Sequence, residues 1–267
     1  MTDQKRIVVK VGTSTITHEN GATDLRTLDK LCRVLTGIAG AGHEIILVSS
    51  GAIAVGAGKM RLAKRPETLR EKQAAAAVGQ CELMHLYDKL FAEYGRLVAQ
   101  ILLVESDVED AMHRENLKNT FDALLEQRVI PIVNENDSVS HLEIESKEKL
   151  FSDNDMLSAI VAAFVEASDL IILTDTKGLY DKNPAEYRDA TLINRVEQID
   201  DAVKALAKGS GSNRGTGGMV TKLDAAAFAT ARGIDVHITY GREPENLYRI
   251  LDGEAAGTLF PGKRTTP

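Results

Sequence analysis

A run of glycine, threonine and lysine at residues 215–222 (GTGGMVTK) could bind a phosphate group. Glycine lacks a Cβ atom, so the backbone there can turn tightly and approach a ligand closely. An Ala-rich helical pattern follows at residues 223–232, and a helix N-terminus presents unpaired N–H groups with a partial positive charge. Phosphate is the usual occupant of such a site, and Lys222 adds a mobile charge. Standing alone, this run would more simply be a glycine-rich turn.

Lys10 is a second candidate for phosphate neutralisation, because it ends a strand-like run and precedes the small polar residues 12–15 (GTST). A lysine reaching from a sheet edge into solvent is an equally good interpretation of Lys10 alone. The run at residues 152–155 (SDND) opens a helical pattern, where serine and aspartate are favoured caps. One residue suffices for capping, so an acid here could also orient two lysines toward a phosphoryl group.

Two further runs follow strand-like segments and suit a polar ligand. Residues 49–56 (SSGAIAVG) are small, and they either leave backbone N–H groups and hydroxyls open to an anion or allow tight packing of a helix on a sheet. Residues 134–138 (NENDS) are all polar and are expected to lie outside the core. A solvated turn is the simple interpretation of this run. Its asparagine and aspartate side chains could instead bind the ammonium and carboxylate groups of an amino acid.

A fifth run, residues 174–180 (TDTKGLY), follows another apolar strand and could contact the base or ribose of a nucleotide. An ordinary strand-to-turn junction is the alternative. The sequence contains neither the Gly-x4-Gly-Lys phosphate loop nor a Gly-x-Gly-x-x-Gly run after the first strand. Histidine and cysteine residues lack zinc spacing, and a Gly-x-Ser-x-Gly nucleophile motif is missing. We therefore predict no set of protein metal ligands.

Strand and helix patterns alternate along the whole chain and must position these residues. The expected strands are residues 7–11, 44–48, 96–104, 129–133, 170–174 and 235–239, with a short edge strand at 257–260. The expected helices are residues 25–41, 67–94, 116–127, 154–166, 199–207 and 219–232. The alternation predicts an α/β protein, a three-layer αβα sandwich with a mostly parallel central sheet. Ligands of such sheets bind at the carboxyl ends of the strands.

Length and composition limit the classes of function. The 267 residues, 43% of them hydrophobic, suffice for a large core, and we expect one domain at residues 1–260 with a tail at 261–267. A net charge of −7 and an aromatic content of 4% without tryptophan argue against nucleic-acid binding. We expect no signal peptide and no membrane span. Cys32 and Cys81 are expected to be free thiols, which favours a cytoplasmic location.

The five runs, in this order, resemble the amino acid kinase family, and within it the members that phosphorylate the side-chain carboxylate of L-glutamate. The resemblance covers nearly the whole chain. Its most specific motifs are VKVGT at residues 9–13, VSSGAI at 48–53, QAAAAVGQ at 73–80, PIVNEND at 131–137, DND at 153–155, LTDTKGLY at 173–180 and GTGGMVTK at 215–222.

The resemblance implies a role for each candidate residue. Lys10 and Lys222 would flank the phosphoryl group during transfer, and Asp155 would hold the two lysines in place. The residues implied for glutamate are Ser50, Gly51, Asn134, Asp137 and Asn154. Those implied for ATP are Lys10, Thr174, Asp175, Thr216, Gly217, Gly218, Met219, Val220, Thr221 and Lys222. The N-terminal part would thus bind glutamate, and the C-terminal part, about residues 170–260, would bind ATP.

The implied reaction transfers a phosphoryl group from ATP, with Mg²⁺ as cofactor, to the γ-carboxylate of L-glutamate as the first step of proline biosynthesis. Implied partners are L-proline as a feedback inhibitor, a glutamyl-phosphate reductase and further copies of the chain in a dimer or tetramer. The alternatives are a kinase of the same family for aspartate, N-acetylglutamate, carbamate or UMP, and a non-catalytic amino-acid or nucleotide sensor. ATP turnover would separate the sensor from the kinases.

Two features of the sequence differ from the pattern of that branch of the family. Many members carry a C-terminal RNA-binding-like module called PUA, and we expect none after the Gly-Thr-Leu-Phe run at residues 257–260. Residues 140–150 (SHLEIESKEKL) are also longer than the usual pattern. Both differences bear on oligomeric state and feedback control.

Overall fold

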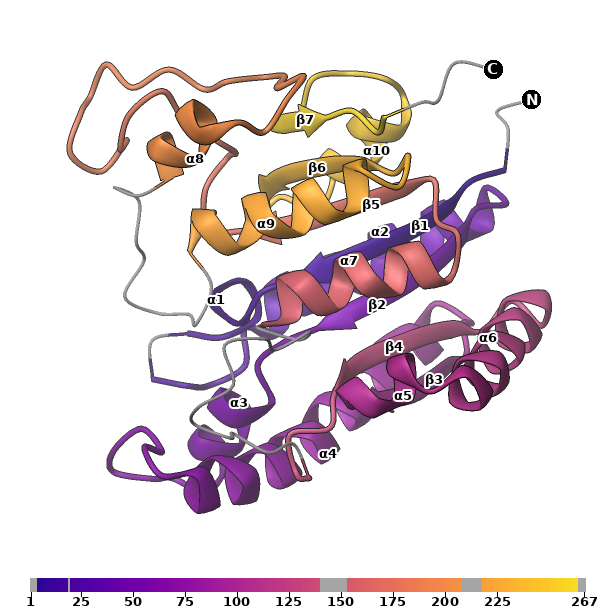
Figure 1. Ribbon diagram of the computed structural model, residues 1–267. Coiled ribbons are helices and arrows are strands. Elements are labelled where there is room, and N and C mark those ends of the chain that lie inside the picture. The colour runs from indigo at the N-terminus through magenta and orange to yellow at the C-terminus, as the bar shows by residue number, and fades with distance from the viewer. Residues whose placement is uncertain (1–3, 19, 140–152, 208–217, 264–267) are drawn as a thin grey trace.

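The computed structural model describes residues 4–18, 20–139, 153–207 and 218–263. Seven strands of the described residues form one sheet. Its order is β3 (Val98–Leu103), β4 (Ile130–Glu135), β2 (Glu44–Ser49), β1 (Arg6–Val11), β5 (Asp169–Thr174), β6 (Asp235–Tyr240) and β7 (Thr258–Phe260). Figure 1 shows the sheet from β7 at the top to β3 and β4 at the bottom. All neighbouring strands are parallel except β7, which runs antiparallel to β6. The mostly parallel sheet predicted from the sequence is confirmed.

Helices cover both faces of the sheet, so the three-layer arrangement is also confirmed. One face carries α5 (Glu105–Glu109), α6 (Ala111–Glu126), α7 (Asn154–Phe164), α8 (Asp201–Ala207) and α9 (Met219–Thr230). The other carries α1 (Thr13–Ile16), α2 (Leu25–Gly40), α3 (Ala52–Lys59), α4 (Leu69–Glu93) and α10 (Asn246–Leu251). Among the described residues, no helix is long and apolar enough to cross a membrane.

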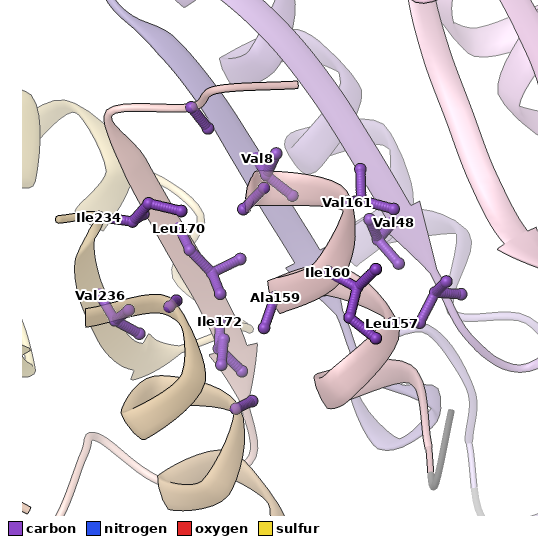
Figure 2. Close-up of a cluster of buried hydrophobic side chains, with 14 of the residues drawn as sticks. Val8, Val48, Leu157, Ala159, Ile160, Val161, Leu170, Ile172, Ile234 and Val236 are labelled. Atoms are coloured by element: carbon purple, nitrogen blue, oxygen red, sulfur yellow. The ribbon is translucent and has the colours of Figure 1, made fainter. Parts of the chain in front are cut away.

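Two hydrophobic cores form because alternate side chains of a strand point to opposite faces of the sheet. On β1, Val8 packs in the core beneath α7 and α9, whereas Ile7 and Val9 pack in the core beneath α2 and α4. Figure 2 shows Val8 and Val48 facing Leu157 and Val161 of α7. The same alternation places Lys10 on the face of Val8, toward α7 and α9.

The ends of some elements differ from the predicted ones. Helix α6 begins at Ala111, five positions before the predicted start at 116, because the carboxylate of Asp110 accepts hydrogen bonds from the backbone N–H groups of Met112 and His113. The short helices α1, α3, α5 and α10 were not among the expected elements. They are brief and lie next to turns, so hydrophobic periodicity cannot identify them.

One prediction about a candidate run was wrong. Residues 134–138 were expected to lie outside the core, but β4 continues through Asn134 and Glu135, and Asn134 is only 2% exposed. Burial of this amide is tolerated because its nitrogen and its oxygen both have hydrogen-bond partners.

Candidate active site

A cleft of about 1090 Å³ lies where the strands end. Strands β1, β2, β4 and β5 are parallel, so their carboxyl ends meet at one edge of the sheet. Strands β2 to β4 lie on one side of β1 and β5 to β7 lie on the other, so the strand order changes direction at β1. Such a change of direction is the usual place for a ligand in this class of sheet. The candidate residues that line the cleft are Lys10, Ser50, Gly51, Asn134, Asp137, Asn154, Asp155, Thr174, Asp175 and Lys222.

The central feature of the cleft is a lysine–aspartate cluster formed by Lys10, Asp155 and Lys222. The Nζ atom of Lys10 lies 2.6 Å from Oδ1 of Asp155, and Nζ of Lys222 lies 3.0 Å from Oδ2. Both lysines are 6% exposed and the aspartate is 1% exposed. Lys10 lies on β1 in the middle of the sheet, so the alternative of a lysine reaching into solvent from a sheet edge is wrong.

Local structure explains why three distant residues meet. Asp153 caps α7 by accepting hydrogen bonds from the backbone N–H groups of Asp155 and Met156, which places Asp155 in the first turn. Helix α9 begins after Gly218, so Lys222 also lies near a helix N-terminus. The hydroxyl of Thr221 donates to Oδ2 of Asp155 at 2.9 Å. Helices α7 and α9 pack side by side on one face of the sheet (Figure 1). This packing brings Asp155 and Lys222 together, and Asp155 also contacts Lys10.

The electrostatics of this cluster favour an anionic ligand. Burial alone would raise the pKa of Asp155, but the two adjacent ammonium groups outweigh it and lower the pKa to about 2. The aspartate is therefore ionised at neutral pH. The three side chains together carry one net positive charge in a buried position, and N–H groups of the first turn of α9 add to the positive potential. A phosphoryl group matches this potential.

Next to the charged cluster lies an amide cluster, which comprises Ser50, Gln80, Asn134 and Asn154. The side-chain nitrogen of Asn154 lies 2.9 Å from Oγ of Ser50 and 3.0 Å from Oδ1 of Asn134. The nitrogen of Asn134 in turn lies 2.9 Å from Oε1 of Gln80. Gly51, with a φ of 101°, makes the left-handed turn between Ser50 and α3 that a residue with a Cβ atom would resist.

Asp137 lines the same cleft and lies two positions after the end of β4. Burial, and then the nearby carboxylate of Glu135, raise the pKa of Asp137 to about 6. A carboxylate with this pKa would be stabilised by a bound cationic group such as an α-ammonium. The structure thus brings together all five residues predicted for the amino-acid side: Ser50, Gly51, Asn134, Asp137 and Asn154.

The residues predicted for ATP are only partly brought together. Thr174 and Asp175 line the cleft, and the hydroxyl of Thr174 donates to Asp175 at 3.1 Å. Gly218 and Met219 begin α9, and the side chain of Met219 is buried in the core, so contact with a ligand there would use the backbone. Val220 and Thr221 follow in the first turn without lining the cleft. Thr216 and Gly217 lie outside the described residues, as do residues 140–150.

Several residues of the cleft were missed from the sequence. Asp153 was not among the predicted site residues, yet it lines the cleft and its buried Oδ2 atom has no hydrogen-bond partner among the described residues. Its position before Asp155 was the available signal. Arg61, Lys64, Arg65 and Lys72 also line the cleft. Their positive charges in an acidic chain were a signal too, but a charged run is usually a solvated surface.

The donor set fits a nucleotide carrying Mg²⁺. Among the described residues, no group of three or more histidine, cysteine, aspartate or glutamate side chains could hold a metal ion. Mg²⁺ in kinases needs no such cage, since it is held by substrate phosphates, waters and one or two carboxylates. Asp153, with its unpartnered carboxylate oxygen, and Asp175 lie in the cleft and could supply those contacts or bind a metal-bound water.

Comparisons with known proteins agree with this geometry. The glutamate 5-kinase of Clostridium perfringens is 54% identical over 262 residues, which are 98% of this chain and 97% of that protein. The glutamate 5-kinase of Listeria innocua is 48% identical, over 98% of this chain and 95% of that protein. The solved carbamate kinase of Giardia lamblia bound to AMP-PNP aligns over 98% of this chain and 99% of its own, with a TM-score of 0.67. At 15% identity that likeness shows the fold alone.

A model of the amino acid kinase family matches residues 5–240. This match and the two relatives each extend over most of the chain, and the lysine–aspartate cluster lies inside the matched region. The chain therefore belongs to the amino acid kinase family.

Proposed function

We propose that this chain is a glutamate 5-kinase, which transfers the γ-phosphoryl group of ATP to the γ-carboxylate of L-glutamate and forms L-glutamyl 5-phosphate, the first intermediate of proline biosynthesis. The buried lysine–aspartate cluster beside the amide cluster is the observation that carries the proposal. Its geometry suits a phosphoryl group adjacent to an amino acid. The high identity to glutamate 5-kinases over nearly the full chain supports this substrate over the other acceptors of the family.

The chemistry needs charge neutralisation more than a base. A glutamate side chain has a pKa of about 4.3, so its carboxylate is already ionised and nucleophilic at pH 7. Two anionic reactants must approach in line, which makes positioning and electrostatic stabilisation the main tasks. Lys10 and Lys222 flank the transferred group in this proposal, and Asp155 holds them in place. Asp153 and Asp175 would hold Mg²⁺ directly or through water, and the ion would supply further positive charge for the phosphates of ATP.

The two substrates occupy different parts of one cleft in this proposal. The amide cluster and Asp137 bind glutamate, with the Asp137 carboxylate facing its ammonium group. Thr174, Asp175 and the first turn of α9 bind ATP. This places glutamate on the N-terminal part of the 1–260 domain and ATP on the part after about residue 170, with Lys10 and Lys222 contacting the phosphates between them.

Partners and location are proposed on chemistry. An acyl phosphate hydrolyses readily, so a glutamyl-phosphate reductase is the proposed consumer of the product. L-proline is the proposed feedback inhibitor, acting at the glutamate subsite, and a dimer or tetramer is the proposed assembly. Cys32 and Cys81 are both free thiols, which supports the proposed cytoplasmic location.

The deciding experiment measures ADP release from ATP and Mg²⁺ with separate acceptors: L-glutamate, L-aspartate, N-acetyl-L-glutamate, carbamate and UMP. Hydroxylamine traps any acyl phosphate as a hydroxamate. We expect turnover that depends on L-glutamate and yields the γ-hydroxamate. Turnover only with another acceptor would overturn the glutamate assignment, and no turnover with any acceptor would favour a non-catalytic sensor.

A further inference from the structure

Gln80 ends the QAAAAVGQ run in the middle of α4. Its Oε1 atom accepts a hydrogen bond from the side-chain nitrogen of Asn134 at 2.9 Å. Asn134 lines the cleft and Gln80 does not. Gln80 therefore contacts a residue of the proposed glutamate subsite but does not itself line the cleft.

Two partners hold the Asn134 amide, the backbone N–H group of Glu135 at its oxygen and Gln80 at its nitrogen. The N–H group of Glu135 donates to Oδ1 of Asn134 at 2.9 Å. A backbone N–H group can only donate, so the side-chain oxygen of Asn134 must face it. The nitrogen of Asn134 then points toward Gln80, which must present its oxygen. Since Asn134 is 2% exposed, water cannot readily replace Gln80 as the acceptor.

The orientation of the Asn134 amide also determines how Asn154 and Ser50 are oriented in the cleft. The nitrogen of Asn154 donates to Oδ1 of Asn134 at 3.0 Å and to Oγ of Ser50 at 2.9 Å. Both hydrogens of the Asn154 amide are thereby committed, which leaves its oxygen to accept from a ligand. Ser50 accepts from Asn154, so its own hydrogen can be donated elsewhere. Asn154 and Ser50 thus offer one acceptor and one donor, which match the ammonium and a carboxylate of an amino acid.

Helix packing holds Gln80 at a fixed distance from Ser50. Gly56 of α3 and Gly79 of α4 face each other across a close contact. A Cβ atom on Gly56 would lie 1.8 Å from the carbonyl oxygen of Ala75, and one on Gly79 would lie 1.8 Å from that of Ala52. The two helix backbones therefore touch directly. Gln80 directly follows Gly79, and Ala52 directly follows the Ser50–Gly51 turn. The contact between α3 and α4 therefore fixes the positions of Gln80 and Ser50, the two outer members of the amide cluster.

We propose that Gln80 is a positioning residue that sets the affinity for L-glutamate by holding the amide of Asn134, and through it the amide of Asn154 and the hydroxyl of Ser50, in one orientation. The proposal rests on the glutamate 5-kinase activity proposed above. Only the oxygen of Gln80 is used, so an acceptor at this position suffices. Loss of that acceptor leaves a buried N–H group without a partner and removes one of the two contacts that hold the Asn134 amide.

The test compares Gln80→Leu with Gln80→Glu, which keeps an acceptor at the same place. His85→Leu is the matched control, because His85 is an exposed residue of the same helix. For Gln80→Leu we expect the KM for L-glutamate to rise about tenfold, while the KM for ATP and kcat stay within about threefold of the wild type. Gln80→Glu should restore most of the glutamate affinity, and His85→Leu should behave as the wild type.

Equal effects of Gln80→Leu on the two KM values, an unchanged KM for glutamate, or a failure of Gln80→Glu to restore affinity would each overturn the proposal. If Gln80→Leu does not fold, Gln80→Glu with near-normal kinetics supports it and Gln80→Glu with a raised glutamate KM overturns it. Absence of glutamate turnover in the wild type would overturn the proposed function instead. In that case NMR spectra test whether Gln80 holds the Asn134 amide. The side-chain amide protons of Asn134 should be protected from exchange in the wild type and in Gln80→Glu, and should lose that protection in Gln80→Leu. Unchanged protection in Gln80→Leu would overturn the proposal.

Discussion

The lysine–aspartate cluster and the amide cluster lie side by side but are held together by different forces. The first consists of three buried charges, with distances of 2.6 and 3.0 Å between the ammonium and carboxylate groups. The second consists of neutral groups joined by hydrogen bonds of 2.9 to 3.0 Å. The first turn of α7 contributes to both clusters, with Asn154 in the amide cluster and Asp155 in the lysine–aspartate cluster. One helix start therefore supplies a neutral and a charged residue to adjacent parts of the cleft.

This difference separates two tasks. Charges in a buried site act strongly on charge that develops in a transition state, so the lysine–aspartate cluster should control kcat. Neutral amides act only at hydrogen-bond distance and favour a correctly oriented ligand, so the amide cluster should control the KM for glutamate. Four predictions challenge or refine this division, beginning with the largest effect.

Removal of Lys222 should have the largest effect. We expect Lys222→Ala to lower kcat by about 10³, comparable to the loss of a strong electrostatic contact to a transition state. The KM for glutamate should change little. Lys204→Ala is the matched control, since Lys204 of α8 pairs with Asp224 of α9 and both are half-exposed. Near-normal kcat in Lys222→Ala, with a normal circular dichroism spectrum, would remove this lysine from the chemistry.

Neutralisation of Asp155 should lower both activity and stability. Asp155→Asn keeps the shape of the side chain but leaves Lys10 and Lys222 buried without their shared carboxylate. We expect kcat to fall by about 10² and the free energy of unfolding to fall by about 3 kcal/mol. Urea denaturation measures the second effect, with Asp224→Asn at a half-exposed position of α9 as control. Unchanged stability would mean that the cluster is more hydrated than its burial implies.

Protonation of Asp137 should weaken glutamate binding in acid. The pKa of this residue is raised to about 6, so the carboxylate loses its charge as the pH falls through that value. We expect kcat/KM for glutamate to decline below pH 6 by about tenfold per pH unit, because this ratio reports groups of the free enzyme.

Asp155, with a pKa of about 2, stays ionised throughout that range and does not contribute. Asp137→Asn should abolish the acid limb and raise the glutamate KM by at least about tenfold. The same limb in kcat/KM for ATP, or its persistence in Asp137→Asn, would assign the titration to a different group.

Loss of the Thr221 hydroxyl should have the smallest effect. The hydroxyl lies 2.9 Å from both Asp155 Oδ2 and the carbonyl oxygen of Gly218, so its single hydrogen is shared between two acceptors. We expect Thr221→Val to reduce kcat by about fivefold, in line with one hydrogen bond to a charged group that is already paired. Thr221→Ser should restore the rate. A drop as large as that of Lys222→Ala would show that Thr221 contacts the substrate directly.

Predictions from the sequence succeeded where the signal was local or periodic. The apolar runs at β1, β2 and β5 and the alternation with helices predicted the three-layer fold, because parallel strands buried on both faces leave continuous hydrophobic runs. Polar runs after those strands predicted a site at one edge of the sheet, where the cleft lies, and the roles of its residues stay predictions. The short helix α3 and the burial of Asn134 were not predicted, since each depends on neighbours that are remote in the sequence.

The sequence by itself determined which residue types end each strand and begin each helix, and thus that Lys10, Ser50, Asn134 and Asp155 share one edge. Only the tertiary structure decided the pairs: Asp155 with Lys222, 67 positions away, and Asn134 with Gln80, 54 positions away. Periodicity gives the face of a strand or helix, but not the partner that meets it. The packing of α7 against α9 and of α3 against α4 determines these partners, because two closely packed helices have a fixed position relative to each other.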